Sequence, residues 1–160
     1  MSGADAEIVM QYYGQIKAMR RILRKEREEL ESGYNTIHGT GMDGMPKAPG
    51  AGDVVGETAT RLAEEGVADR LQELDVRDEV LRQDMEDIGR ALRVLRDVYS
   101  QALTMHYRDR HKWREVAGIM KYSESHILRL RRRALEMLGE QLEEVPMSGE
   151  LLARARDARA

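Results

Sequence analysis

The stretch Lys112–Leu138, KWREVAGIMKYSESHILRLRRRALEML, decides the fold expected for this chain. Apolar residues recur in it at helical spacing on both sides of a short polar interruption, Lys121-Tyr122. Ser123 follows as a helix N-cap, because its hydroxyl can accept a hydrogen bond from a free backbone N–H of the first turn. The stretch therefore predicts two helices joined by a tight turn.

The apolar positions of both predicted helices form inward faces, and Ala117 is small where the helices would cross. This is the pattern of a helix-turn-helix, whose second helix enters the major groove of DNA. The inward positions are Trp113, Val116, Ala117, Met120, Ile127, Leu130, Ala134, Leu135 and Leu138. Trp113 is expected in the core, because it shares the apolar face.

The outward face of the second helix predicts contacts with DNA. Its first residues, Glu124, Ser125, His126 and Arg129, are the expected base-reading residues. Arginine can pair with guanine, and glutamate can accept a hydrogen bond from cytosine. The expected contacts with phosphate are Lys112, Arg114, Lys121, Arg131, Arg132 and Arg133.

Charge is distributed unevenly along the 160 residues, although the net charge is only −3. Residues 53–98 hold thirteen Asp/Glu and seven Arg, a balance of −6, whereas residues 108–138 hold nine Lys/Arg and four Asp/Glu, a balance of +5. Only the basic end is expected to meet a polyanion. The chain has no cysteine, which excludes disulfides and thiolate metal sites.

The rest of the chain predicts an all-α protein with two long helices before the basic end. Residues 1–32 are expected to form a helix that ends at Gly33, and residues 33–56, with seven glycines and two prolines, a flexible linker. Residues 57–93 are expected to form a coiled-coil-like helix, and residues 94–139 the helix-turn-helix domain. The acidic, then Ala/Arg-rich residues 140–160 are expected to be a frayed helix or disordered.

Two apolar seams leave alternatives open. Spacings of three and four connect Val9 to Leu30 in the first helix, and Val67 to Ala102 in the second. The first helix can fold back antiparallel on the second, or the Val67–Ala102 seam can make a homo-oligomer. Asp78 is the one polar residue of the second seam, and it either sets the register or lies in a hydrated turn. We expect residues 1–52 to be removable without unfolding the remainder.

The sequence favours neither an enzyme nor a cofactor site. Its histidines and carboxylates lack the HExxH spacing of a metal site, and no nucleophile has a paired base. Asp84, Glu86 and Asp87 are close in sequence, but a helix spreads them around its circumference. With no apolar run of membrane-spanning length, we expect no membrane association and a place in the cytoplasm.

The stretch Lys112–Leu138 resembles region four of bacterial sigma factors, in its E-V-A, its Ser cap and its R-A-L-x-x-L ending. It is closer still to sigma-region-four-like proteins of phages and prophages, including RinA/ArpU-type late-transcription regulators. The resemblance implies duplex DNA as ligand and contact with host RNA polymerase. Leu128 departs from the basic residue that sigma factors often have, and Glu124 from a common base-reading arginine.

These observations together predict a sequence-specific DNA-binding transcription regulator of a phage or prophage. It would bind a site without melting it, because the chain lacks an aromatic-rich region two. A small terminase subunit, which marks phage DNA for packaging, is an alternative of the same class. A coiled-coil adaptor whose basic end binds an acidic protein is an alternative of another class.

Overall fold

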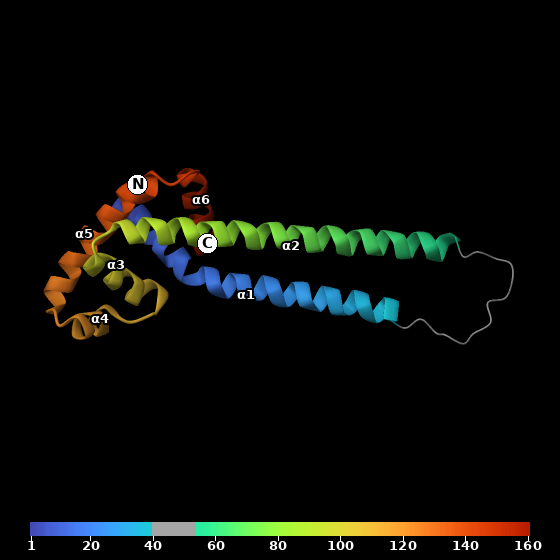
Figure 1. Cartoon of the computed structure of the whole chain (residues 1–160), viewed down its shortest axis with the longest axis horizontal. Helices are drawn as coiled ribbons and strands as arrows, with labels where there is room; N and C mark the ends of the chain where they lie inside the picture. Colours follow the sequence, from blue (N-terminus) through green and yellow to red (C-terminus); the bar gives the residue numbers. More distant parts are fainter. Residues whose placement is uncertain (40–53) are drawn as a thin grey trace. The chain divides into compact units, whose positions relative to one another are not determined.

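The computed structural model describes residues 1–39 and 54–160, with side chains described for residues 1–34 and 59–160. The all-α prediction is confirmed for this part of the chain, which contains helices and no strand. The helices are α1 (Gly3–Gly39), α2 (Val54–Val94), α3 (Asp97–Leu103), the π-helix η1 (Thr104–Arg108), α4 (Trp113–Met120), α5 (Glu124–Glu143) and α6 (Ser148–Arg159) (Figure 1). Most of the predicted linker, residues 40–53, lies outside the described residues.

The chain divides into two compact units, and both long helices pass through both of them. Unit 1 contains residues 1–19 and 81–160, and unit 2 contains residues 20–80. The first turns of α1 belong to the same unit as the predicted helix-turn-helix. That residues 1–52 can be removed without unfolding the remainder stays a prediction.

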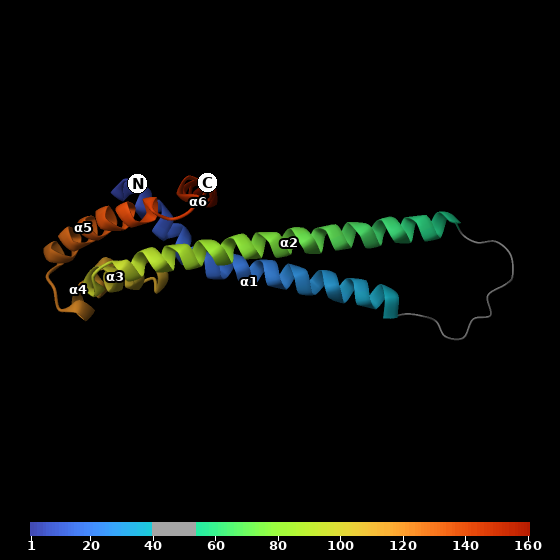
Figure 2. The same ribbon diagram turned by 45° about the horizontal axis from the view of Figure 1, so that its top comes forward.

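Unit 2 is a hairpin of two antiparallel helices (Figure 2). Arg20 Nε donates to Asp78 Oδ1 over 2.7 Å, and Arg27 Nε donates to Asp75 Oδ1 over 2.7 Å. Residues later in α1 pair with residues earlier in α2, so the two helices are antiparallel. Of the two arrangements that the sequence leaves open, this is the one in which the first helix folds back on the second. Asp78 also accepts a second bond from Arg20 over 3.0 Å. This two-pronged pair suits the register-setting role, since it is geometrically specific.

Unit 1 buries the first turns of α1. Apolar side chains there are at most 2% exposed; these are Ala6, Val9, Met10, Tyr12 and Ile16. Gly14 lets the helix approach η1 closely, because a Cβ at this position would lie 2.1 Å from the carbonyl oxygen of Tyr107. The seam of α1 thus packs within its own chain.

Asp84 is the most buried charged residue described, at 2% exposure. Its carboxylate accepts a hydrogen bond from the Tyr12 hydroxyl over 2.7 Å, and two from Arg154, at 2.9 Å from Nε and 2.6 Å from Nη2. A buried charge is tolerated when it is paired and hydrogen-bonded in this way. Burial, reinforced by Asp84, raises the pKa of Tyr12 above its usual range. Local residue order does not distinguish Asp84 from Glu86 and Asp87, because the partners of Asp84 lie about 70 residues away in either direction.

The end of the first helix and the course of the second seam differ from the prediction. Gly33 lies inside α1, which continues to Gly39, so a glycine is not a sufficient stop signal. The second seam crosses a break, since α2 ends at Val94 and Arg96 is extended with ψ 143°. No Gly or Pro marks this break; packing of α3 against α5 outweighs local helix propensity.

The C-terminal tail is helical, which corrects the expectation of fraying or disorder. α5 continues to Glu143, and α6 follows after a turn in which Met147 has φ 58°. Leu151 and Ala155 of α6 are buried. Arg154 anchors this helix on Asp84, an attachment that the residue pattern of the tail does not reveal.

Gly14 and Gly33 provide a test of the packing of α1. Gly14→Ala is expected to lower the free energy of unfolding by about 2 kcal/mol, because overpacking against a backbone carbonyl forces a shift. Gly33 has open space around it, so Gly33→Ala is expected to raise that free energy by about 0.5–1 kcal/mol. Urea unfolding followed by circular dichroism measures both. Equal effects of the two substitutions would contradict the close approach.

Candidate functional site

The turn between α4 and α5 has the geometry that the sequence predicts. α4 ends at Lys121, which takes the left-handed conformation with φ 59°, and the Tyr122 N–H donates to the Ala117 carbonyl over 2.9 Å. Ser123 is extended, and its Oγ accepts from the His126 N–H over 3.2 Å. The predicted Ser123 cap is confirmed, and it sets where α5 begins.

The start of α4 is fixed by its own residues. The Lys112 N–H donates to Glu115 Oε2 over 2.9 Å, which satisfies a backbone donor at the beginning of the helix. This backbone hydrogen bond lowers the pKa of Glu115. Lys112 is exposed at the helix start, as a phosphate-binding role requires.

The inner faces of α4 and α5 close on a third helix. Val116, Ala117, Ile127 and Leu130 form a buried cluster with Ala102 of α3. Partly buried side chains pack against this cluster; they are Val98, Tyr99, Met105, Trp113 and Met120. The predicted inward positions are thus all buried or half-buried, and Trp113 packs on the core. The contribution of Ala102 was missed, because the break before α3 has no local signal.

The expected base-reading residues Glu124, Ser125, His126 and Arg129 are all exposed. Neighbours constrain three of them. The Ser125 hydroxyl oxygen lies 3.3 Å from that of Ser123. The His126 ring stacks on Tyr122, with centroids 4.5 Å apart, and Arg114 Nε lies 3.4 Å from Glu124 Oε1. The exposed cations around them are Lys112, Arg114, Lys121, Arg132 and Arg133.

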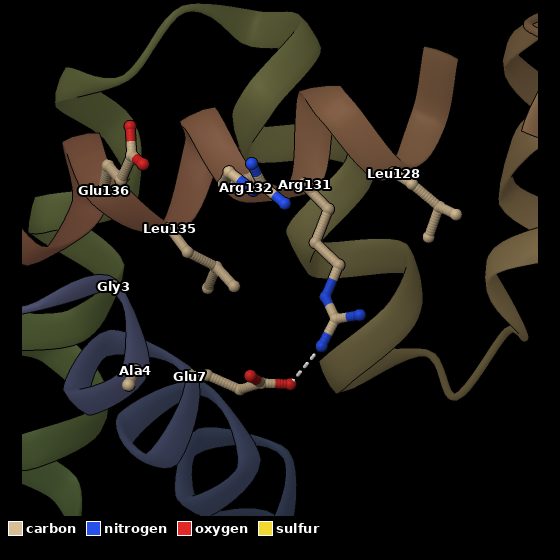
Figure 3. Close-up of a pocket in the computed structure, with 8 residues that line it drawn as sticks. All are labelled: Gly3, Ala4, Glu7, Leu128, Arg131, Arg132, Leu135 and Glu136. Carbon is tan, nitrogen blue, oxygen red and sulfur yellow. Dashed lines mark hydrogen bonds and ion pairs between the residues drawn. The ribbon is translucent and has the colours of Figure 1, made fainter. Parts of the chain in front are cut away.

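Arg131 differs from the other arginines of the run. Its guanidinium forms an ion pair with Glu7 of α1 (Figure 3), and its Cζ lies 5.4 Å from the centre of the Trp113 ring. Glu7 also accepts from the Tyr107 hydroxyl over 3.1 Å. Arg131 is among the residues predicted to contact phosphate, and here its half-buried guanidinium is paired with Glu7. The sequence could not separate it from Arg132, since three consecutive arginines look alike.

His106 packs against Trp113 and Tyr107, the two aromatic residues next to the Arg131–Glu7 pair. Its ring stacks on Trp113 with centroids 4.2 Å apart, and its Nδ1 lies 2.7 Å from the His111 carbonyl oxygen. Burial lowers the pKa of His106, which favours the neutral ring at neutral pH. This histidine is a packing element of the η1–α4 connection.

A hollow of about 580 Å³ lies between the first turns of α1 and α5 (Figure 3). It is lined by Gly3, Ala4, Glu7, Leu128, Arg131, Arg132, Leu135 and Glu136. A Cβ at Gly3 would be in ordinary van der Waals contact with the Glu136 side chain, at 3.6 Å, whereas a Cβ at Gly139 would lie only 2.3 Å from the Met1 carbonyl oxygen. α1 therefore accompanies α5 from Arg131 onward, whereas the first turns of α5 remain open.

No family model, curated protein or solved structure matches this chain. Within residues 1–39 and 54–160, no group of three His, Asp or Glu side chains is placed to hold a metal ion. None of the described helices is long and apolar enough to cross a membrane. The resemblance to sigma region four stays a prediction, and the geometry of α4 and α5 carries the functional argument.

The separate role of Arg131 can be tested against its neighbour. Arg131→Gln is expected to lower the free energy of unfolding by about 1–2 kcal/mol, because it removes the ion pair to Glu7 and the cation–π contact with Trp113. Arg132→Gln, on the exposed side, is expected to change it by less than about 0.5 kcal/mol. Urea unfolding measures both, and a similar loss in the two variants would contradict the distinction.

Proposed function

We propose that this protein binds duplex DNA sequence-specifically through α4 and α5, acting as a sigma-region-four-like helix-turn-helix. One observation carries the proposal. The first two turns of α5 expose polar side chains on one side, with cations before and after them, while the opposite side packs on α3 and α4. A helix face that only keeps the protein soluble would not need its polar side chains flanked by cations on both sides.

The dimensions and chemistry of α5 suit the major groove. A helix with its side chains is about 10–12 Å wide, and the groove is about 12 Å wide. Arg129 would pair with guanine, and Ser125 can either donate or accept. Glu124 would accept from cytosine, in exchange for its contact with Arg114.

The exposed cations lie where the two DNA backbones would pass. Lys112, Arg114 and Lys121 belong to α4 and its two ends, and Arg132 and Arg133 follow the reading turns of α5. Contacts to phosphate position the protein without reading sequence. Arg131 takes no part in this set, because its guanidinium is half-buried against Glu7, whereas Arg114 and Arg133 are exposed although each lies near a glutamate.

A transcription regulator of a phage or prophage is the biological role that we propose. Its support is the resemblance of Lys112–Leu138 to sigma region four, which also suggests bacterial RNA polymerase as a partner. The described residues add nothing that would melt DNA, so binding would recruit or block polymerase rather than open a promoter.

Selection of bound sequences from random duplex DNA is the decisive experiment, combined with the mass of the complex in solution. Enrichment of one site supports the proposal, and enrichment of none refutes it. A site within the gene of a packaging protein, bound by a ring-like assembly, would favour the small terminase subunit. Binding of an acidic protein in place of DNA would favour the adaptor.

The salt dependence of binding tests the phosphate contacts. Replacing both Arg132 and Arg133 with Gln is expected to reduce the slope of log K against log salt concentration by about 2, since each phosphate contact contributes about 0.9. The preferred sequence should not change. Affinity measured by fluorescence anisotropy between about 50 and 200 mM salt provides the slope.

The matched control for this prediction is Arg21→Gln with Arg24→Gln, which removes the same charge from exposed positions of α1. This control should keep the original slope. If both double variants reduce the slope equally, net charge rather than contact at α5 governs binding.

A further inference from the structure

Leu128 is an exposed apolar residue among polar residues on the outward face of α5. Ser125, Leu128, Arg129 and Arg132 are spaced at i, i+3, i+4 and i+7, which places them on one side of the helix. Ser125, Arg129 and Arg132 are polar, and all four are exposed. Leu128 has 52% of its side-chain surface exposed in the middle of this stripe.

The other leucines of α5 show that this exposure is specific. Leu130, Leu135 and Leu138 are at most 7% exposed and serve the core. Figure 3 shows Leu128 at the end of the hollow, with its side chain pointing away from Gly3 and Ala4. Leu128 therefore does not complete the contact between α5 and α1.

The stripe is open only near the start of α5. The N-terminal segment borders α5 from Arg131 onward, through the ion pair between Glu7 and Arg131 and the close approach of Met1 to Gly139. Residues 124–129 span about 9 Å of helix at 1.5 Å per residue. This length matches about three base pairs at about 3.4 Å each. Leu128 lies within this short open segment.

We infer that Leu128 contacts the C5-methyl group of a thymine and thereby determines part of the sequence preference. This inference rests on the proposed DNA-binding function and deepens it. Among the groups on the major-groove edges of the bases, the thymine methyl is the apolar one. The cations Arg129 and Arg132 beside Leu128 favour a polyanion over an apolar protein groove as the occupant of this face.

Replacement of thymine by deoxyuridine tests this contact, because it removes only the methyl group. The probe is the duplex enriched by selection from random DNA, with each thymine replaced in turn. One replacement is expected to weaken binding by the wild-type protein about fourfold, the effect of about one buried methyl group. Leu128→Ala should bind the thymine and uracil duplexes equally.

Two further variants make the result specific. Leu128→Met keeps an apolar side chain and should retain sensitivity to the methyl group. Leu62→Ala removes a leucine of similar exposure, 63%, from α2 in unit 2, and should behave like the wild type. Circular dichroism confirms that each variant is folded.

The outcomes separate this inference from the function on which it rests. If the wild-type protein selects a sequence but no uracil replacement weakens binding, the contact is refuted and DNA binding stands. The same conclusion follows if Leu128→Ala keeps the sensitivity. If the wild-type protein selects no sequence, the proposed function itself fails.

Discussion

The burial of the Asp84 carboxylate is the constraint on which unit 1 depends. A charge removed from water must be compensated, and here the compensation comes from Tyr12 of α1 and Arg154 of α6. Helices from the beginning, the middle and the end of the chain are thereby joined at one carboxylate. The tail, which has no apparent residue pattern, is thereby attached to the rest of unit 1 through Arg154. The first turns of α1 are held where Gly14 can contact η1.

This placement of α1 defines the proposed DNA-binding surface. Glu7 extends from α1 to Arg131, so one arginine of the basic run is used to hold Trp113 and Tyr107 in place. The remaining cations stay at the surface around the start of α5. In the proposed complex, an acidic residue far away in sequence thus determines which arginines are available to phosphate.

The local features of the site were predictable from the sequence, whereas its long-range features were not. The turn at Lys121-Tyr122 and the Ser123 cap depend on neighbouring residues, and both are found. The interruption of the second seam at Arg96 and the continuation of α1 through Gly33 depend on packing, and the residue pattern indicated neither. The sequence does not predict a site at Asp84, because Glu86 and Asp87 point in other directions around the same helix. The partners that bury Asp84 come from other helices.

The sequence by itself determined that the chain is helical, where α4 and α5 begin, and which of their faces is apolar. Periodicity and capping act over a few residues, so they can be read directly from the residue order. Only the tertiary structure decided that the first turns of α1 and all of α6 belong to the same unit as α5, that Arg131 is paired with Glu7, and that Leu128 is exposed. These facts depend on which surfaces meet in space, and burial of a charge or an apolar face can be satisfied by partners anywhere in the chain.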